Sequence, residues 1–270
     1  MVRRPPFSLP AIGFNQLVEC RHGIMICNKN DRYVGESLIR YGEFSPGESE
    51  LFRKLINRGM IVVEIGANIG AHTVELSQLV GPQGSVIAFE PQRLVFQTLC
   101  ANLALNNCAN VHAFPNAVGD RAGFINVPFL DPDQPNNFGG LSLLDAKAGE
   151  NIPLLTLDSI GLPNCHFLKI DVEGMEVEAL RGSATTIERF RPVIYTEDDR
   201  KERSAELIQV LLDFRYRIYR HSPALFSSDN FAGDQNNIFG NIVSHNLLCI
   251  AAERALVVEG SVEITAPPSS

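Results

Sequence analysis

Short apolar runs alternate with helix-like patterns along most of the chain. From residue 60 onward, apolar runs predict strands at 60–65, 85–89, 110–114, 166–170, 192–196, 215–220 and 246–252. Apolar residues at helical spacing predict helices at 70–79, 92–105, 174–188 and 202–213. This alternation predicts an α/β fold, in which helices cover both faces of a mainly parallel sheet.

Three segments depart from the alternation. Residues 14–27 read as a hairpin that turns near Gly23, and two helices, expected at 31–40 and 47–57, are placed to form a lid or platform. Residues 120–158 contain a candidate strand at 123–129 followed by a long loop. Residues 221–246 form a second irregular stretch, and loops of this length are often functional.

These patterns predict three parts of the chain. They are an N-terminal extension over 1–58, a core domain over 59–256 and a disordered tail over 257–270. Residues 1–13 are also expected to be poorly ordered, because proline and small or polar residues are frequent at both ends.

Composition narrows the class of protein. The chain has 270 residues, of which 45% are hydrophobic, enough for one sizeable core. Its formal net charge of −8 makes nucleic acid an unlikely partner. The six cysteines form no CxxC pair or zinc-like spacing, so reduced thiols are expected. No run approaches the roughly 20 apolar residues of a membrane-spanning helix. A cytoplasmic location is expected.

The stretch EIGANIGAH, residues 64–72, follows a predicted strand and resembles a ligand-binding glycine turn. A dinucleotide fingerprint, GxGxxG, needs a glycine where Asn68 stands. Glu64 ends the strand with a carboxylate, which favours a cation over a pyrophosphate. Glu90 lies 20 residues after Gly70, at the spacing of an acid that accepts hydrogen bonds from ribose hydroxyls. Together these features favour S-adenosyl-L-methionine over a nicotinamide dinucleotide, although each alone also fits a tight turn or a helix cap.

Six motifs in order resemble the FkbM family of S-adenosylmethionine-dependent methyltransferases, over about residues 60–198. They are VVEIGANIGAHT, GSVIAFEPQ, NAVGD, TLDSI, LKIDVEGMEVEALRG and RPVIYTE. The resemblance implies a class I methyltransferase (Rossmann-like) fold, with a seven-stranded, mainly parallel sheet whose last strand is antiparallel. It also implies O-methylation of hydroxyls, often on sugars in glycans or on secondary metabolites.

The resemblance assigns cofactor-binding roles by position. The cofactor turn, the start of its helix, the ribose-binding acid and the segment near adenine correspond to Glu64, Gly66, Ala67, Asn68, Gly70, His72, Thr73, Glu90, Asn116 and Ala117. His72 departs from the family pattern, since an aromatic residue is common there. Residues of the long loop, Asn137, Gly139, Gly140 and Ser142, are further candidates for cofactor or acceptor contact.

Three acids are candidate catalytic residues. Asp171 and Glu173 follow one predicted strand and Glu197 ends the next, so all three can converge at one edge of the sheet. Such a cluster can raise one pKa and create a general base for an alcohol, which is a poor nucleophile until its proton is removed. A divalent metal is a possible occupant, but no decisive ligand set indicates one. Alternatively, Asp171 and Glu173 cap the following helix.

Other candidates come from outside the motifs. His221 and His245 flank the second irregular stretch and are alternative bases, Lys169 is expected to pair with one of the acids, and Tyr41 and Glu43 are candidates to close over the cofactor. The sequence thus predicts an S-adenosylmethionine-dependent O-methyltransferase that acts on a hydroxyl of a sugar, glycan or other polar small molecule. The alternative is a nicotinamide-dependent, sugar-modifying oxidoreductase. Neither the acceptor nor the oligomeric state is indicated by the sequence.

Overall fold

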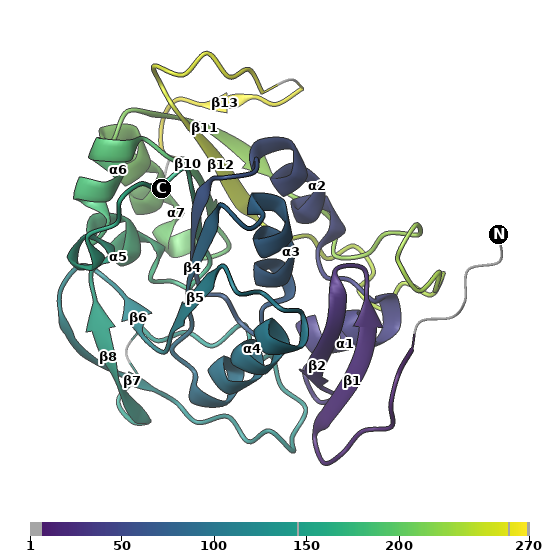
Figure 1. Cartoon of the computed structure of the whole chain (residues 1–270). Coiled ribbons are helices and arrows are strands. Elements are labelled where there is room, and N and C mark those ends of the chain that lie inside the picture. The colour runs from purple at the N-terminus through teal and green to yellow at the C-terminus, as the bar shows by residue number, and fades with distance from the viewer. Residues whose placement is uncertain (1–6, 145, 259, 269–270) are drawn as a thin grey trace.

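A central sheet with helices on both faces organises the chain (Figure 1). The structure is a computed structural model, and it describes residues 7–144, 146–258 and 260–268. The sheet has eight strands in the order β13, β11, β12, β10, β9, β3, β4 and β5. Across these described ranges, every helix is too short or too polar to cross a membrane.

The central strands are parallel, as the sequence predicts. β3 (Ile61–Ile65), β4 (Ser85–Phe89), β5 (Val111–Phe114), β9 (Phe167–Ile170) and β10 (Val193–Glu197) pair in parallel. Neighbouring side chains such as Val62 and Val63 point to opposite faces, and both are fully buried. β12 (Asn246–Ala251) lies antiparallel between β10 and β11 (Tyr216–His221), so the last long strand is antiparallel, as expected.

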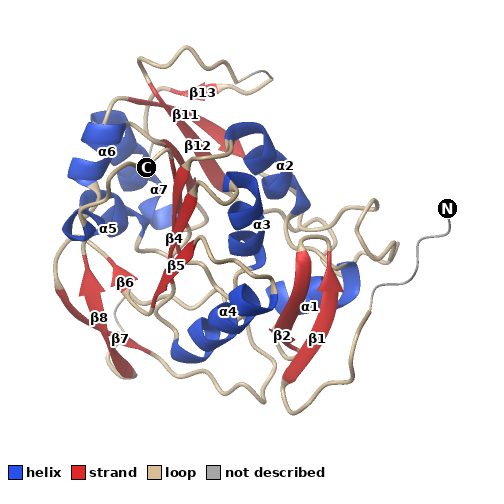
Figure 2. Cartoon of the chain, in the orientation of Figure 1, coloured by secondary structure: helices blue, strands red, loops and turns tan. Residues whose placement is uncertain are grey.

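Helices cover the two faces of this sheet (Figure 2). On one face lie α2 (Pro46–Leu55), α3 (Ala71–Val80) and α4 (Arg93–Leu105), and on the other α5 (Glu176–Arg181), α6 (Ala184–Phe190) and α7 (Lys201–Asp213). Phe52 of α2 packs with Leu76 of α3 over the first face, and Leu180 and Leu211 pack over the second. Both faces of the sheet are therefore buried beneath helices and shielded from water, which explains why the strands are continuous apolar runs.

The single helix expected at 174–188 is wrong, because the segment forms two helices, α5 and α6. The break lies at Gly182 and Ser183, where the backbone passes close to Gly119. A Cβ atom on Gly182 would lie 1.9 Å from the carbonyl oxygen of Gly119. The apolar pattern continues through the break, since Leu180 and Ile187 are both fully buried, and so periodicity alone does not reveal it.

The segment between β5 and β9 forms a small second sheet. It contains β6 (Ala117–Val118), β7 (Gly123–Val127) and β8 (Glu150–Leu155), with β8 in the middle, followed by a short 3₁₀ helix, η1 (Leu157–Ile160). β7 corresponds to the strand expected at 123–129, whereas β6 and β8 were not predicted. β6 is only two residues long, and Pro153 interrupts the strand pattern of β8.

The N-terminal extension forms the expected hairpin and helices. β1 (Asn15–Cys20) and β2 (Gly23–Asn28) pair antiparallel, and α1 (Val34–Tyr41) follows them before α2. The expectation of poor order over 1–13 is wrong for the described part, since the Leu9 amide donates to the carbonyl of Leu17 and Ser8 bridges to Val18. Residues 1–6 lie outside the described chain.

The prediction of a disordered tail over 257–270 is wrong for Glu263–Ile264. These residues form β13, which pairs antiparallel with β11 and makes the eighth strand. Without β13, the outer edge of β11 would leave its backbone N–H and C=O groups unpaired, so an added strand satisfies them. Residues 259, 269 and 270 lie outside the described part of this segment.

Candidate functional site

A cleft opens at the carboxyl ends of β3, β4, β9 and β10, where ligands of open α/β sheets bind. Its volume is about 1190 Å³, the open mouth included. Among the predicted site residues, those that line it are Glu64, Gly66, Ala67, Asn68, His72, Glu90, Asp171, Glu173 and Glu197. The cleft thus brings together most residues of the predicted cofactor turn and all three candidate catalytic acids.

The glycine turn after β3 has left-handed backbone at three positions. Gly66 has φ +89°, and a Cβ atom there would lie 1.8 Å from the carbonyl oxygen of Asp171. Asn68 has φ +51°, a conformation that asparagine tolerates better than most residues. Gly70 has φ +88° and precedes α3. The turn is therefore held close to β9, and only glycine fits at position 66.

Glu90 holds the turn in place from the end of β4. Its two carboxylate oxygens accept hydrogen bonds from the backbone amides of Asn68, at 2.9 Å, and Gln92, at 2.8 Å. Glu90 is almost fully buried, and burial raises its pKa to about 7, although the two amides act in the opposite direction. The acid predicted to bind ribose therefore also shapes the turn beneath it.

Glu64 lies at the floor of the cleft in a buried polar network. The hydroxyl of Thr73 donates to Glu64 Oε2 at 2.7 Å, and Lys169 Nζ lies 3.7 Å from Glu64 Oε1. Burial raises the pKa of Glu64 to about 7, against the lowering effect of Lys169. Thr73 itself does not line the cleft, so its role in this geometry is to orient Glu64.

A smaller apolar hollow of about 470 Å³ adjoins the cleft beyond Glu90. Asn116 and Ala117 line it, as do Phe89, Leu141, Leu143 and Met175. Gly66, Glu90, Gly139, Asp171 and Glu173 are among the residues that line both spaces, so the hollow adjoins the cleft. A flat, largely apolar base would fit such a hollow, and the adenine position expected for Asn116 and Ala117 stays a prediction.

The three candidate catalytic acids converge at the cleft mouth. One oxygen from each of Asp171, Glu173 and Glu197 lies within 4.8 Å of the others. Lys169 Nζ contacts Asp171 at 3.0 Å and Arg200 contacts Glu173 at 2.6 Å, whereas the buried Oε2 of Glu197 has no hydrogen-bond partner among the described residues. This spacing would suit a divalent cation, but two of the acids already have cationic partners.

Burial and mutual repulsion raise the pKa values of two acids in this cluster. Burial, Asp171 and Asp199 raise the pKa of Glu173 to about 8, against the lowering effect of Arg200. Burial and the same acids raise the pKa of Glu197 well above its ordinary value. The cluster therefore holds a carboxyl group that exchanges its proton near neutral pH, as a general base requires.

Among the described residues, no side chain caps α5, the helix after DVEG, whose N-cap position is Met175. The carboxylate of Glu176 accepts hydrogen bonds from the amides of Val172, at 3.2 Å, and Gly174, at 3.0 Å. Asp171 and Glu173 instead line the cleft and pair with Lys169 and Arg200. The alternative role of these two acids as helix caps is therefore not what the structure shows.

A comparison with models of known protein families shows which family this chain matches. The model of the methyltransferase FkbM domain matches residues 64–218, more than half of the chain. The chain belongs to the FkbM methyltransferase family. The match contains the glycine turn, Glu90 and all three acids of the cleft mouth, and it leaves the oxidoreductase alternative without support.

Similar proteins agree with the family. Methyltransferase 1 of Beauveria bassiana is 30% identical over 148 residues, which cover 45% of this chain and 57% of that protein. Methyltransferase sdnD of Sordaria araneosa is 29% identical over 154 residues, 45% of this chain and 59% of that protein. The matches thus span little more than half the length of these curated relatives.

The crystal structure of methyltransferase FkbM from Methylobacillus flagellatus has a similar fold. Its TM-score is 0.50 at 17% identity, and the match covers 74% of this chain and 50% of that one. The expected class I methyltransferase fold is thereby confirmed, with one strand more than the seven expected.

Two residues that line the cleft were not among the candidates predicted from the sequence. Glu48 of α2 lies at the cleft floor, and its Oε2 is 3.6 Å from His72 Nε2. Asn246 of β12 donates to Glu48 Oε1 at 3.4 Å. No motif marks either residue, since Glu48 lies in the extension and Asn246 is 198 positions further along the chain.

The remaining candidates divide between the cleft and the scaffold. Asn137, Gly139, Gly140 and His245 line the cleft, whereas Ser142 and His221 do not. His221 Nδ1 instead lies 2.8 Å from the hydroxyl of Tyr195. Tyr41 and Glu43 do not line the cleft either, and Glu43 pairs with Arg21.

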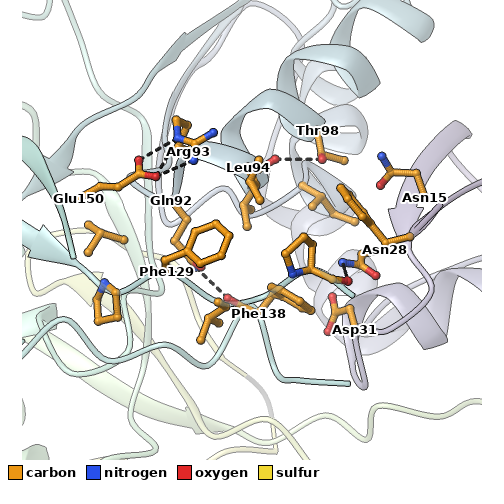
Figure 3. Close-up of a pocket in the computed structure, with 17 residues that line it drawn as sticks. Asn15, Asn28, Asp31, Gln92, Arg93, Leu94, Thr98, Phe129, Phe138 and Glu150 are labelled. Carbon is orange, nitrogen blue, oxygen red and sulfur yellow. Dashed lines mark hydrogen bonds and ion pairs between the residues drawn. The ribbon is translucent and has the colours of Figure 1, made fainter. Parts of the chain in front are cut away.

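A separate, mostly apolar cavity of about 660 Å³ lies behind the turn, between the hairpin, the start of α4 and the loop around Phe129 (Figure 3). Gln92 lines both this cavity and the cleft, and its side-chain amide donates to the carbonyl of Phe138 at 2.7 Å. Arg93 and Glu150 form an ion pair at its rim. None of the predicted site residues lines this cavity.

Proposed function

We propose that this protein transfers a methyl group from S-adenosyl-L-methionine to a hydroxyl of a sugar, a glycan or another polar small molecule. The charge of the cleft is the observation that carries the proposal. Of the described residues that line it, seven are acids, namely Glu48, Glu64, Glu90, Asp171, Glu173, Glu197 and Asp199, and one is a lysine, Lys169. Burial raises the pKa of several of these acids, and a cation bound among them would favour their ionised forms. The cleft therefore favours a ligand with a sulfonium and an ammonium group and disfavours a pyrophosphate.

The shape of the site supports the same ligand. Glu90 stands between the apolar hollow and the larger part of the cleft, where it can accept hydrogen bonds from ribose hydroxyls while the base occupies the hollow. When bound, S-adenosyl-L-methionine would supply the electrophilic methyl group. The remaining space, towards Glu173, Glu197 and His245, is left for an acceptor.

The acid cluster suits an alcohol acceptor. Methyl transfer is an in-line displacement, so the first task of the residues is to align the acceptor oxygen. Glu173 or Glu197 would accept the hydroxyl proton as the new O–C bond forms and the C–S bond breaks, and the proton would then pass to water. The raised pKa of Glu173, about 8, matches this role near neutral pH. A cytoplasmic location stays a prediction from the sequence.

Calorimetric titration tests the cofactor. S-adenosylhomocysteine should bind the wild-type protein at micromolar to low millimolar concentration, and NAD should not. Glu90→Gln should weaken S-adenosylhomocysteine binding by about tenfold, because a neutral amide replaces a charged hydrogen-bond acceptor. If NAD binds and S-adenosylhomocysteine does not, the methyltransferase proposal is wrong.

A labelled methyl donor tests the acceptor class. The protein is incubated with S-adenosylmethionine carrying a ¹³C methyl group and with panels of monosaccharides, glycosides, alcohols and amines, and products are identified by mass and by the chemical shift of the methyl carbon. An O-methyl product is expected. A product methylated only on nitrogen or carbon would contradict the hydroxyl acceptor while leaving the cofactor assignment intact.

A further inference from the structure

The polar and the apolar residues of the cleft come from different parts of the chain. Within the range of the family match, 64–218, the described residues that line the cleft are charged or polar, or are glycine or alanine. The larger apolar and aromatic side chains all come from outside this range, and they are Tyr33, Val34, Phe44, Leu225, Ile242 and Val243. We call these six residues the apolar wall. The wall is therefore built by the segments that flank the matched domain.

The apolar wall is held in place by the packing behind it. The loop before β12 lies beside α1 (Figure 1). Tyr33 stacks on Phe239, with ring centroids 6.1 Å apart, and Phe44 packs against the cluster in which Leu225 and Phe239 are buried. The amide of Leu225 donates to the carbonyl of Ile242 at 3.3 Å, and the amide of Ile242 donates to the carbonyl of Phe239 at 3.1 Å. A wall that is ordered in advance loses little conformational entropy when a ligand binds.

The apolar wall adjoins the acid cluster of the cleft mouth. Asn246 of β12 pairs in register with Glu197 of β10, and the amide of Asp198 donates to the carbonyl of His245 at 2.7 Å. Ile242 stands three residues before His245, a stretch of chain that spans at most about 10 Å. A molecule with a hydroxyl at the acids would therefore place its neighbouring groups against the wall.

The chemistry of the apolar wall indicates what those groups are. Ile242 is 43% exposed, which is common for a single residue on a protein surface. Here, however, it lies in a concave site with five other wall residues, and such apolar lining is typical of small-molecule sites. Apart from the Tyr33 hydroxyl, the wall side chains have no hydrogen-bonding group, and four of the six are aliphatic. The wall thus suits a group that leaves water readily, and it offers little to the hydroxyls of a free sugar.

The acids beside the wall suit the opposite kind of group. The carboxylates of Glu173, Glu197 and Asp199 line the same cleft, and carboxylate oxygens accept hydrogen bonds from several hydroxyls at once. We propose that the acceptor is amphipathic, with a polyhydroxylated part at the acids and an apolar group against the wall, as in a glycoside with an apolar aglycone. This inference rests on the proposed methyl transfer to a hydroxyl, and it narrows the acceptor to one chemical class.

Two glycosides of the same sugar isolate the contribution of the apolar group. Methyl β-D-glucopyranoside and octyl β-D-glucopyranoside differ only in the length of the alkyl chain. Titration calorimetry with each glycoside, below the concentration at which micelles form, is performed on the protein saturated with S-adenosylhomocysteine. The octyl glycoside should bind the wild type about tenfold or more tightly than the methyl glycoside, because each buried CH₂ group contributes up to about fourfold in affinity.

Substitution of Ile242 locates the octyl chain. Ile242→Ser should reduce the preference for the octyl glycoside by about threefold or more, whereas Ile242→Leu should keep it within about twofold, because leucine preserves the apolar surface. Phe124→Ser is the matched control. Phe124 of β7 is 68% exposed and lies outside the cleft, so its loss should leave the preference unchanged.

The failure of this inference and the failure of the proposed function are distinguishable. The amphipathic acceptor is overturned if the octyl glycoside binds the wild type no more tightly than the methyl glycoside, or if neither binds. It is also overturned if Ile242→Ser keeps the full preference, or if Phe124→Ser reduces it equally, since the chain would then bind outside the cleft. In each of these cases S-adenosylhomocysteine still binds and the proposed function stands. A wild type that does not bind S-adenosylhomocysteine would refute the proposed function, and this inference with it.

Discussion

Glu173 combines an unfavourable backbone with a crowded carboxylate. Its φ of +55° lies in the left-handed region, which costs about 1 kcal/mol or more for a residue with a side chain. Its carboxylate lies among Asp171, Glu197 and Asp199, with Arg200 as its cationic partner. Strain and like-charge crowding of this kind persist where a side chain must point to a defined place, here the cleft mouth.

The pH dependence of turnover follows from this crowding. If the cluster supplies the base, kcat/KM should rise with pH, with its midpoint near pH 8 and a plateau about one unit higher, since only the ionised form accepts a proton. Glu173→Gln should reduce turnover by about 10²–10⁴-fold and abolish the rise. Steady-state rates measured from pH 5.5 to 9.5 with an identified acceptor provide the measurement. If Glu197→Gln has this effect and Glu173→Gln does not, the base is Glu197.

The free energy of unfolding of the ligand-free protein should fall as pH rises, whereas kcat/KM should rise. The folded-state pKa of Glu173 lies above the value of 4.5 expected for the unfolded chain. Between about pH 4.5 and 8 the folded protein therefore keeps a proton that the unfolded chain releases, and the free energy of unfolding falls as pH rises. Glu173→Gln should flatten this fall by roughly 1–3 kcal/mol in urea unfolding at pH 5 and pH 8.

Residues in contiguous motifs were the most predictable ones. Glu64, Gly66 and Glu90 each stand at the end of a strand or in its turn, and strand ends of a parallel sheet meet at one edge. Glu48 was not predicted because its place on the cleft floor depends on how α2 packs against α3, through Phe52 and Leu76. Helical periodicity indicates which side of α2 is buried but not which neighbour that side will meet.

At the level of elements, the apolar periods correctly predicted the long strands and most helices. They did not predict the break between α5 and α6, where two backbone segments approach closely. The gap between α5 and α6 depends on Gly119, which lies more than 60 residues before Gly182. β6 forms by pairing with β8, and β8 pairs with both β6 and β7, while neither β6 nor β8 has a clear strand pattern alone. Non-local contacts of this type are absent from any short window of sequence.

Substitution of Gly182 tests the break. Gly182→Ala places a Cβ atom against the Gly119 carbonyl, so α5 and β6 must separate, and we expect a destabilisation of about 1–3 kcal/mol in urea unfolding. Gly123→Ala is the matched control, because a Cβ atom there meets nothing within 4 Å, and its effect should lie within about 0.5 kcal/mol of zero. Equal stabilities of the two variants would show that the close approach is not a constraint.

At the scale of the whole molecule, the cleft is bounded by segments outside the range of the family match. The extension contributes Tyr33, Phe44 and Glu48, and the loop before β12 contributes Leu225 and His245. These two segments pack together, with the ring of Tyr41 edge-on to Phe226 and Phe239. The division into an extension over 1–58 and a core over 59–256 stays a prediction, and the two parts share this wall of the cleft.

Tyr41 is the polar link between these segments. Its hydroxyl donates to the carbonyl of Asn236 at 2.7 Å and accepts from the amide of Ile238 at 2.9 Å. Tyr41→Phe removes both hydrogen bonds but keeps the ring contacts, so residues 226–240 should exchange their amide hydrogens about tenfold faster, which corresponds to the loss of about 1.4 kcal/mol of local stability.

Tyr219→Phe is the control for this prediction. The hydroxyl of Tyr219 donates to Glu263 at 3.2 Å, far along the sheet, so its loss should speed exchange near β13 and leave residues 226–240 unchanged. Hydrogen exchange followed by mass spectrometry resolves the two regions. Because Leu225, Ile242 and His245 line the cleft on either side of the linked segment, Tyr41→Phe should also raise the KM for an acceptor more than the KM for S-adenosylmethionine. Unchanged exchange at 226–240 would mean that the aromatic contacts alone hold the wall of the cleft.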